Sequence, residues 1–261
     1  MTDEALFTID RRLRPLLPPH VGIRMAPSSR IGMPLSPTIS GSKKREQELR
    51  AGRICAIQAL MDVGWRSKLE ALNSSVAITE LSSDLLTQII SVGDDRAPIW
   101  PTGFVGSISH SPNWTWAVAA PLNKLKNVGI DTEAVLSLDS YEVVRQEIGS
   151  LSEWSLLNNQ SLRPELETTL MFSAKEAYFK LWYPIVHQFY DFEDVILTDV
   201  SPNDCDSDNV ADNPSLSLYF RTRSESAGCH FRLDQSSLTR VRVLWNDADV
   251  FSAAWLAASI D

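Results

Sequence analysis

Two long stretches of the chain carry apolar residues at helical spacing, and shorter apolar runs typical of strands follow each of them. The first helical stretch covers residues 42–63, with a charged side opposite the apolar stripe. The second covers residues 165–183, and Pro184 is predicted to end it because the residue before a proline avoids helical geometry. The chain is therefore expected to pack helices against sheets.

The remaining elements are shorter and are separated by turn residues. Further helices are predicted at 82–90, 141–148 and 153–158. Strands are predicted at 104–110, 114–120, 127–133, 215–222, 229–234, 239–245 and 251–257. Residues 1–40 are predicted to be mostly loop with short elements, and the acidic segment 201–214 a surface loop. The apolar runs 114–120 and 251–257 resemble each other, which suggests two related halves with a boundary near residue 125.

Composition argues against several classes of protein. The net charge of −9 and the lack of a basic stripe speak against nucleic-acid binding. No apolar run of about 18 residues and no signal-peptide pattern occurs, so we expect a cytoplasmic protein without a membrane span. The three cysteines, Cys55, Cys205 and Cys229, are scattered, as in proteins of reducing compartments. Four histidines without ligand spacing argue against zinc.

Two acids, Asp131 and Glu133, follow an apolar run and stand two residues apart on a predicted strand, so they share one face of it. Neighbouring carboxylates repel each other and favour a bound cation. Oxygen ligands suit Mg²⁺, with Mn²⁺ as the alternative, and Mg²⁺ usually keeps phosphate oxygens among its ligands. The simpler interpretation is a strand edge on which both acids face solvent.

A third acid, Glu176, lies on the second long helix, with Lys175 before it and Lys180 one turn later. Glu176 is a candidate third carboxylate of a metal–phosphate site, in which the two lysines balance phosphate charge. Two simpler interpretations compete with this one: a capping box formed with Ser173, and an ordinary helix pair with Lys180.

Other candidate phosphate ligands are spread along the first half of the chain. Ser109 and His110 end a predicted strand before a turn, where a histidine and adjacent backbone N–H groups can bind phosphate. Arg45 and Arg53 lie eight residues apart on the first long helix, within about 80° of each other around its axis. They can bind one anion together, or they can be surface arginines paired with Glu48 or Glu46.

Five segments, in their order along the chain, are similar to the 4′-phosphopantetheinyl transferase superfamily, above all to its enterobactin synthase component D-like branch. They are residues 45–53, 96–101, 106–110, 129–133 and 172–176, and the last continues through 182–184 to 191–194. The likeness covers roughly residues 40–195. One departure is a lysine missing before Arg96, where Val92-Gly93-Asp94-Asp95 stands. This departure predicts a weaker grip on the coenzyme's phosphates.

The resemblance implies an α+β fold of two similar halves, related by a pseudo-twofold axis, with coenzyme A in the cleft between them. Residues 1–125 would form the N-terminal half, which binds the coenzyme's phosphates, and residues 126–261 the C-terminal half, which carries the metal site. The implied enzyme transfers the 4′-phosphopantetheine group of coenzyme A to a serine of an apo acyl or peptidyl carrier protein and releases adenosine 3′,5′-bisphosphate. Siderophore synthesis or secondary metabolism is the implied setting.

The family's site residues carry over where the motifs match. Asp131, Glu133 and Glu176 are expected to hold Mg²⁺. Glu176 is alternatively the general base toward the carrier serine, and Lys180 stabilises the transferring phosphate. The residues expected to bind the coenzyme are Arg45, Arg53, Arg96, Ser109, His110, Lys175 and Lys180.

Three other functions compete with this one: a catalytically degenerate coenzyme A-binding protein, an interaction module for carriers, and a Mg²⁺-dependent phosphohydrolase that uses water in place of the serine. The retained carboxylates argue against the first. Carriers are usually acidic, so the net charge of −9 argues against the second. An enzyme of this charge needs a local apolar or basic dock, expected around Phe179, Trp182 and Tyr183. A monomer is expected, because two halves in one chain are self-sufficient.

Overall fold

The computed structural model describes residues 13–28, 41–66, 81–158, 160–189, 191–202, 214–223 and 238–258. The chain divides into two compact units. Unit 1 comprises Met1–Val128 with Leu256–Asp261, and unit 2 comprises Gly129–Trp255.

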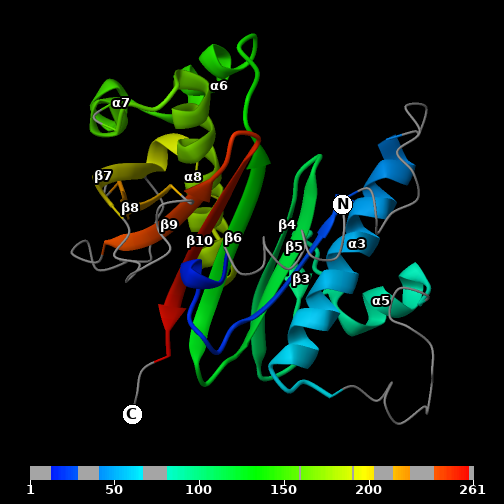
Figure 1. The fold of residues 1–261 in the computed structure, drawn as a ribbon. Coiled ribbons are helices and arrows are strands. Elements are labelled where there is room, and N and C mark those ends of the chain that lie inside the picture. Colours follow the sequence, from blue (N-terminus) through cyan, green and yellow to red (C-terminus); the bar gives the residue numbers. More distant parts are fainter. Residues whose placement is uncertain are drawn as a thin grey trace. The chain divides into compact units, whose positions relative to one another are not determined.

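Unit 1 is built on a small antiparallel sheet covered by a long helix. The strand order of its sheet is β1-β5-β4. The strands are β1 (Gly22–Pro27), β4 (Phe104–His110) and β5 (Trp114–Pro121), and helix α3 (Gly41–Asp62) lies along them (Figure 1). Smaller elements are the 3₁₀ helix η1 (Arg14–Leu16), helix α5 (Ser83–Ile89) and the hairpin of β2 (Ser91–Val92) with β3 (Pro98–Ile99).

The contact between α3 and β5 forms the core of unit 1. The predicted apolar stripe of α3, with Ile57 and Leu60, is buried against the small side chains of β5, such as Ala117. Strand β1 lies just as close to the helix, because a Cβ at Gly22 would be 2.1 Å from the carbonyl oxygen of Ala59. A larger residue at this position would therefore push β1 away from α3.

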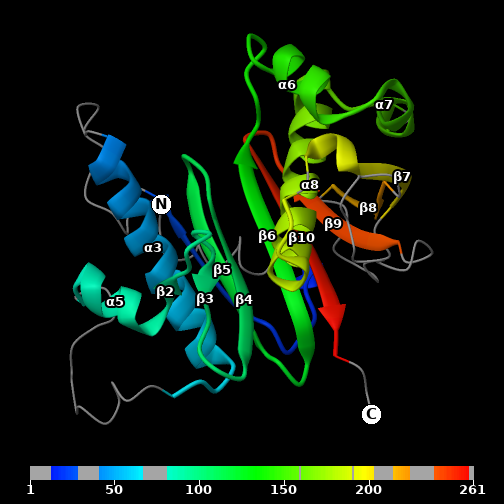
Figure 2. The same cartoon turned by 180° about the vertical axis from the view of Figure 1, so that it is seen from behind.

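Unit 2 contains most of a larger sheet and the helices that flank it. The strand order is β6-β10-β9-β8-β7. The strands are β6 (Leu125–Ala134), β7 (Val195–Pro202), β8 (Ser215–Thr222), β9 (Thr239–Trp245) and β10 (Asp249–Ala257). The helices are α6 (Tyr141–Ile148), α7 (Leu151–Asn158) and α8 (Pro164–Val186), and a 3₁₀ turn, η3 (Phe192–Asp194), precedes β7. Figure 2 shows α8 lying alongside the sheet.

Helix α8 is fixed to this sheet by large side chains. The ring of Tyr178 lies 6.0 Å from that of Phe220 on β8, and Trp182 Nε1 donates to Thr239 Oγ1 on β9 at 3.1 Å. Gly129 marks the crossing of β6 and α8, since a Cβ there would be 2.1 Å from a backbone carbonyl oxygen of the helix. The relative position of β6 and α8, which carry the three candidate carboxylates, is therefore closely constrained.

The predicted mixture of helices and strands is confirmed, with small shifts of the element ends. Strands 104–110, 215–222 and 239–245 match β4, β8 and β9 without a shift. Helix 82–90 is confirmed as α5, and the Ser82 side chain accepts a hydrogen bond from Leu85 N at 3.3 Å, as an N-cap should. The α+β class is thus confirmed.

Residues 22–27 form β1, one of the short elements expected within residues 1–40, because the neighbouring β5 offers a full set of backbone partners for them. One prediction is wrong. Pro184 does not end α8: it lacks an N–H, but the helix continues to Val186. The end is set by His187, whose backbone is left-handed and whose N–H donates to the Tyr183 carbonyl oxygen at 2.8 Å.

Other predictions concern residues around β7 and β8. The sequence reading assigned no strand to residues 195–200, which form most of β7. Of the acidic segment 201–214, residues 201 and 202 belong to β7, while 203–213 lie outside the described residues. The predicted strand 229–234 also lies outside them.

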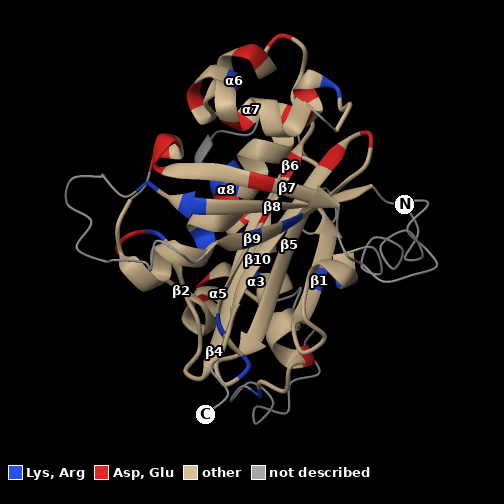
Figure 3. Ribbon diagram, turned by 90° about the vertical axis from the view of Figure 1, so that its left-hand side faces the viewer, with Lys and Arg blue, Asp and Glu red and all other residues tan. Residues whose placement is uncertain are grey.

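Charge is unevenly spread over unit 2. Acidic residues are prominent on α6 and α7 (Figure 3), where Glu142 and Glu147 lie on α6 and Glu153 on α7. Of the helices that the structure describes, none has the length and apolar character needed to cross a membrane.

Candidate active site

The two predicted acids of β6 lie beside α8. Asp131 is only 2% exposed, and Lys180 on α8 donates from Nζ to Asp131 Oδ1 at 2.6 Å. Glu133 is half-buried. The simpler interpretation, in which both acids face solvent at a strand edge, is therefore wrong, and the acids belong to the contact between strand and helix.

Electrostatic interactions tie a third carboxylate, Glu176, to this pair. Burial raises the pKa of Glu176, Asp131 raises it further, and Lys180 acts in the opposite direction. Burial also raises the pKa of Glu133 to about 8, with added repulsion from Asp131 and Glu176. Burial alone would lower the pKa of Lys180, but Asp131 and Glu176 outweigh it, and this pKa is raised. Three carboxylates and one ammonium thus act on one another as one cluster.

The surroundings of Ser173 and Lys180 decide between the interpretations of Glu176. Ser173 is not at a helix start but in the interior of α8, and its Oγ lies 2.9 Å from Ser252 Oγ in the core. The capping-box interpretation is therefore wrong. The ammonium of Lys180, one turn after Glu176, makes its hydrogen bond to Asp131, so it joins helix to strand rather than serving an isolated helix pair.

The chemistry of this cluster fits a hard divalent cation. Its donors are carboxylate oxygens, they repel one another, and the positive charge of Lys180 interacts with all three. Within the described ranges no group of three His, Cys, Asp or Glu side chains converges as a ready-made metal site, and Lys180 is the cation in contact with Asp131. By donor type and charge, the cluster suits Mg²⁺.

Lys175 points away from solvent. Its Nζ donates to the carbonyl oxygens of Ile148 at 2.7 Å and Phe192 at 2.9 Å, and lies 2.9 Å from Glu153 Oε1. The side chains of Lys175 and Glu153 are 1% and 6% exposed. All three N–H bonds of this ammonium are thus used inside unit 2, where they join α8 to α6, α7 and η3.

A small apolar cavity opens beside Glu176. It measures about 230 Å³ and is lined by Phe179, Phe189 and Phe192. Phe189 is 82% exposed, and its ring lies 5.2 Å from that of Phe179. The expected apolar dock therefore needs one correction: Trp182 is only 8% exposed, since its indole is fixed in the core, and cannot take part.

In unit 1 the structure brings His110 to the N-terminal half of α3. His110 Nε2 lies 3.4 Å from Glu48 Oε2, and Glu48 also pairs with Lys44 at 3.7 Å. Arg45 is exposed three residues before Glu48, so it lies on the same side of the helix. Glu48, which was not among the predicted site residues, thus pairs with His110 and lies on the side of the helix that carries Arg45.

The other predicted phosphate ligands of unit 1 are less accessible or lie elsewhere. Arg53 is 7% exposed, and it donates to the carbonyl oxygens of Ile90 at 3.2 Å and Ser91 at 3.3 Å. Ser109 is buried, and it lies on the face of β4 opposite to the one that carries His110. Arg96 is exposed in the β2–β3 turn, where its φ of 67° is unusual for a residue other than glycine.

Two of the matching segments also serve packing. A Cβ at Gly106 would lie 2.4 Å from the ring of Trp100, so the glycine lets this indole cover β4. A Cβ at Gly52 would lie 2.8 Å from Ile108 Cγ2, so this glycine lets α3 approach the same strand. The two glycines of these motifs therefore serve the packing of unit 1 and not the binding of a ligand.

Three residues of these sites were not among the predicted site residues: Glu48, Glu153 and Phe189. Glu48 follows Arg45 at i+3 on a predicted helix, and this spacing was a usable signal. Glu153 is 22 positions from Lys175, so no local pattern joins them. Phe189 follows the end of α8, and its relevance depends on a helix that continues past Pro184.

Comparison with known proteins gives matches over most of the chain. Residues 39–120 match the 4′-phosphopantetheinyl transferase N-terminal domain, and residues 127–243 match the 4′-phosphopantetheinyl transferase superfamily. Enterobactin synthase component D of Salmonella typhi is 33% identical over 141 residues, which are 54% of this chain and 50% of that protein. The 4′-phosphopantetheinyl transferase Npt of Nocardia iowensis is 28% identical over 168 residues, 64% of this chain and 65% of that one. The chain thus spans between half and two thirds of the length of these relatives.

Proposed function

Because this chain belongs to the 4′-phosphopantetheinyl transferase superfamily, we propose that it transfers the 4′-phosphopantetheine group of coenzyme A to a serine of an apo carrier protein. The acceptor is an acyl or peptidyl carrier, and the second product is adenosine 3′,5′-bisphosphate. The likeness to enterobactin synthase component D favours a carrier of siderophore synthesis or secondary metabolism. The observation that carries the proposal is the cluster of Asp131, Glu133, Glu176 and Lys180.

In the proposed reaction the serine oxygen bonds to the β-phosphorus of coenzyme A, and the bond from that phosphorus to the bridging oxygen breaks. The electron pair leaves with adenosine 3′,5′-bisphosphate, and the serine proton passes to a carboxylate oxygen of Glu176. Without a bound cation, burial raises the pKa of Glu176, and in that state it is a better proton acceptor than an ordinary glutamate. The carboxylates keep Lys180 protonated, and its charge stabilises the departing phosphate.

Asp131, Glu133 and Glu176 are the residues proposed to hold Mg²⁺, with Mn²⁺ as the alternative ion. When bound, the ion supplies positive charge to the phosphate oxygens. Glu176 has two candidate roles, ligand and base, and its amide variant distinguishes them. Glu176→Gln weakens Mg²⁺ binding if Glu176 is a ligand, whereas it leaves that binding intact and removes turnover if Glu176 is only the base.

For the coenzyme's phosphates we assign the direct contacts in unit 1 to Arg45, Arg96 and His110, whose side chains are accessible. Arg53 and Ser109 are buried, and we assign them to supporting roles, with Arg53 joining α3 to the end of α5. Lys175 was also expected among the coenzyme's ligands. Its burial supports a different role, in which it holds α8, and with it Glu176, in place.

The wider architecture is part of the same proposal and rests on the family resemblance. It comprises two halves, 1–125 for phosphate binding and 126–261 for the metal, related by a pseudo-twofold axis with the coenzyme in a cleft between them. A monomer in the cytoplasm is proposed as well. The scattered cysteines support a reducing compartment.

The experiment that tests the function follows the release of adenosine 3′,5′-bisphosphate by chromatography, with coenzyme A, Mg²⁺ and an apo carrier present. A transferase releases it only with the carrier, and not with a carrier whose acceptor serine is changed to alanine. Release without any carrier would instead establish a phosphohydrolase. No release, together with coenzyme A binding measured by calorimetry, would establish a degenerate binding protein.

A further inference from the structure

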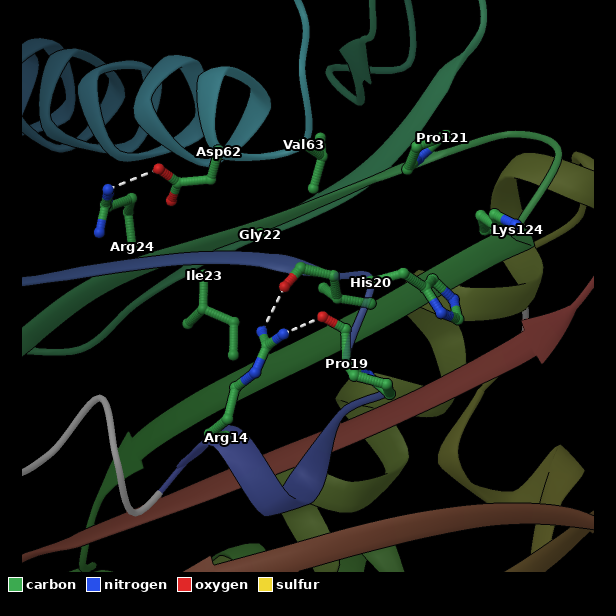
Figure 4. Close-up of a pocket in the computed structure, with 11 residues that line it drawn as sticks. Arg14, Pro19, His20, Gly22, Ile23, Arg24, Asp62, Val63, Pro121 and Lys124 are labelled. Carbon is green, nitrogen blue, oxygen red and sulfur yellow. Dashed lines mark hydrogen bonds and ion pairs between the residues drawn. The ribbon is translucent and has the colours of Figure 1, made fainter.

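Unit 1 contains a cavity of about 580 Å³ at the C-terminal end of α3, the end opposite to Arg45. Figure 4 shows its lining: Arg14 comes from η1, His20 from the loop before β1, and Lys124 from the turn between β5 and β6. Arg24 of β1 completes the set of basic side chains. With Asp62 at the end of α3, the cavity gathers residues from five separate parts of unit 1.

The charge balance of this cavity is positive although the whole chain carries −9. Asp62 is the acid among its described lining residues, and it pairs with Arg24 at 2.5 Å. Arg14 donates to the carbonyl oxygens of Pro19 and Val21, which are uncharged (Figure 4). The charges of Arg14 and Lys124 are therefore not compensated by another residue of the lining.

The surroundings of His20 also indicate an excess of positive charge in the cavity. Its Nε2 is buried and has no hydrogen-bond partner in the described part of the chain. Burial lowers the pKa of His20, and the positive charges of Lys124 and Arg14 lower it further. A neutral imidazole with one unsatisfied nitrogen thus stands beside two cations, and an anion would satisfy all three groups at once.

We propose that this cavity is a binding site for a phosphoryl group, held by Lys124, Arg14 and the imidazole of His20. A guanidinium has five N–H donors, so Arg14 keeps donors for an anion after its two bonds to the loop. The volume exceeds that of a phosphate ion, which leaves room for the rest of a phosphorylated metabolite. This site does not include the residues of the proposed transferase site, so its test is independent of the transferase proposal.

The proposal has a sign that can be checked. An anion beside His20 favours the imidazolium, so binding raises the pKa of His20. By linkage the affinity for the phosphate dianion increases as the pH falls through the range in which His20 takes up its proton. Arg14, Arg24, Lys124 and Asp62 are the charged groups of the cavity lining around this ring.

The test follows the imidazole C–H resonance of His20 by NMR in the full chain, assigned with His20→Gln, during pH titrations with and without inorganic phosphate. Sodium chloride at the same ionic strength is the control for screening. Lys124→Glu removes one cation of the lining, and Lys126→Glu makes the same change of total charge at an exposed residue outside the cavity. Glycerol 3-phosphate as a second probe tells whether an organic phosphate is accepted.

We expect phosphate or glycerol 3-phosphate to raise the pKa of His20 in the parent chain and in Lys126→Glu, and we expect Lys124→Glu to weaken binding about tenfold or more. The milder Lys124→Gln, expected to weaken binding several-fold, covers the case in which the glutamate variant misfolds. If glycerol 3-phosphate raises the pKa of His20 and inorganic phosphate does not, the ligand is an organic phosphate. No change in the pKa of His20 with either probe, or an equal change with chloride or in Lys124→Glu, would overturn the proposal.

Discussion

The ammonium of Lys175 lies 2.9 Å from Glu153 Oε1, and both side chains are almost completely buried. Glu153 also accepts hydrogen bonds from the backbone N–H groups of Leu197 and Ser150, at 3.0 and 2.9 Å. Burial acts to raise the pKa of Glu153, but these donors and Lys175 outweigh it and hold the pKa below its usual value. The pair therefore fixes the helix that carries Glu176 at the residue just before it.

Removing one partner of this pair leaves a buried charge, so Lys175→Met or Glu153→Gln should lower the free energy of unfolding by about 3–5 kcal/mol. Denaturant unfolding measures this loss. The double variant Glu153→Gln/Lys175→Met should lose less than the sum of the two single losses. Lys126→Met at an exposed site is the control and should change stability by less than about 0.5 kcal/mol.

The same variants test the role of Lys175 in catalysis. If Lys175 positions Glu176, the double variant should lower kcat and leave the KM for coenzyme A near its parent value. If Lys175 binds the pyrophosphate instead, the KM should rise strongly. That second result would restore Lys175 to the set of coenzyme ligands.

Sequence reasoning found much of this frame and missed parts that depend on distant partners. The long helices and strands β8 and β9 follow from local periodicity. The position of strand β1 was not predicted, because Gly22–Pro27 shows no clear alternation of apolar and polar residues and becomes a strand through its pairing with β5. Pro184 was read as a stop, although α8 continues past it.

Some features of the candidate site also follow from local sequence patterns, and others depend on residues far apart in the sequence. The spacing of Asp131 and Glu133 and their position after an apolar run predicted a shared face on one strand. The bond from Lys180 to Asp131 spans 49 positions, and no local pattern indicates it. Lys175 and Glu176 are adjacent in sequence but face different surroundings, because successive residues of a helix point about 100° apart.

Lys180 offers a test of the carboxylate cluster. Because its ammonium sits against Asp131 and repels an incoming cation, Lys180→Met should tighten Mg²⁺ binding by about five- to tenfold. The same variant should lower kcat, since the charge that stabilises the departing phosphate is gone. Isothermal calorimetry with Mg²⁺ and a turnover assay measure the two effects. Unchanged or weaker Mg²⁺ binding would show that the metal lies elsewhere.

Glu48 offers a test of the phosphate contacts in unit 1. Its carboxylate lies 3.4 Å from His110 and would compete with a phosphate for that imidazole. Glu48→Gln should therefore bind coenzyme A about two- to fivefold more tightly, as expected for removal of one exposed like charge. The control is Glu46→Gln, an exposed acid on the same helix, which should have little effect. Weaker binding in Glu48→Gln would assign the acid a supporting role instead.

Cys55 on α3 should be chemically inert in the folded protein. Burial raises the pKa of its thiol from 9.0 to about 12, with Arg24 acting weakly in the opposite direction. A raised thiol pKa stabilises the fold fully below pH 9, and this contribution is lost as the pH rises from 9 toward 12. Iodoacetamide at pH 8 should leave Cys55 unmodified in the folded chain and alkylate it in urea, as read by peptide mass. Rapid native modification would contradict this burial.

The central claim is that the carboxylate cluster of unit 2 transfers phosphopantetheine, and the intact mass of an apo carrier tests it most directly. The carrier is incubated with coenzyme A, Mg²⁺ and the parent chain, or with Asp131→Ala, Glu176→Ala or, as the control acid on α6, Glu147→Ala. We predict a gain of about 340 Da, the mass of the transferred group, with the parent chain and Glu147→Ala and none with the other two. No gain on any of several carriers, or an equal gain with Asp131→Ala and Glu176→Ala, would contradict the account.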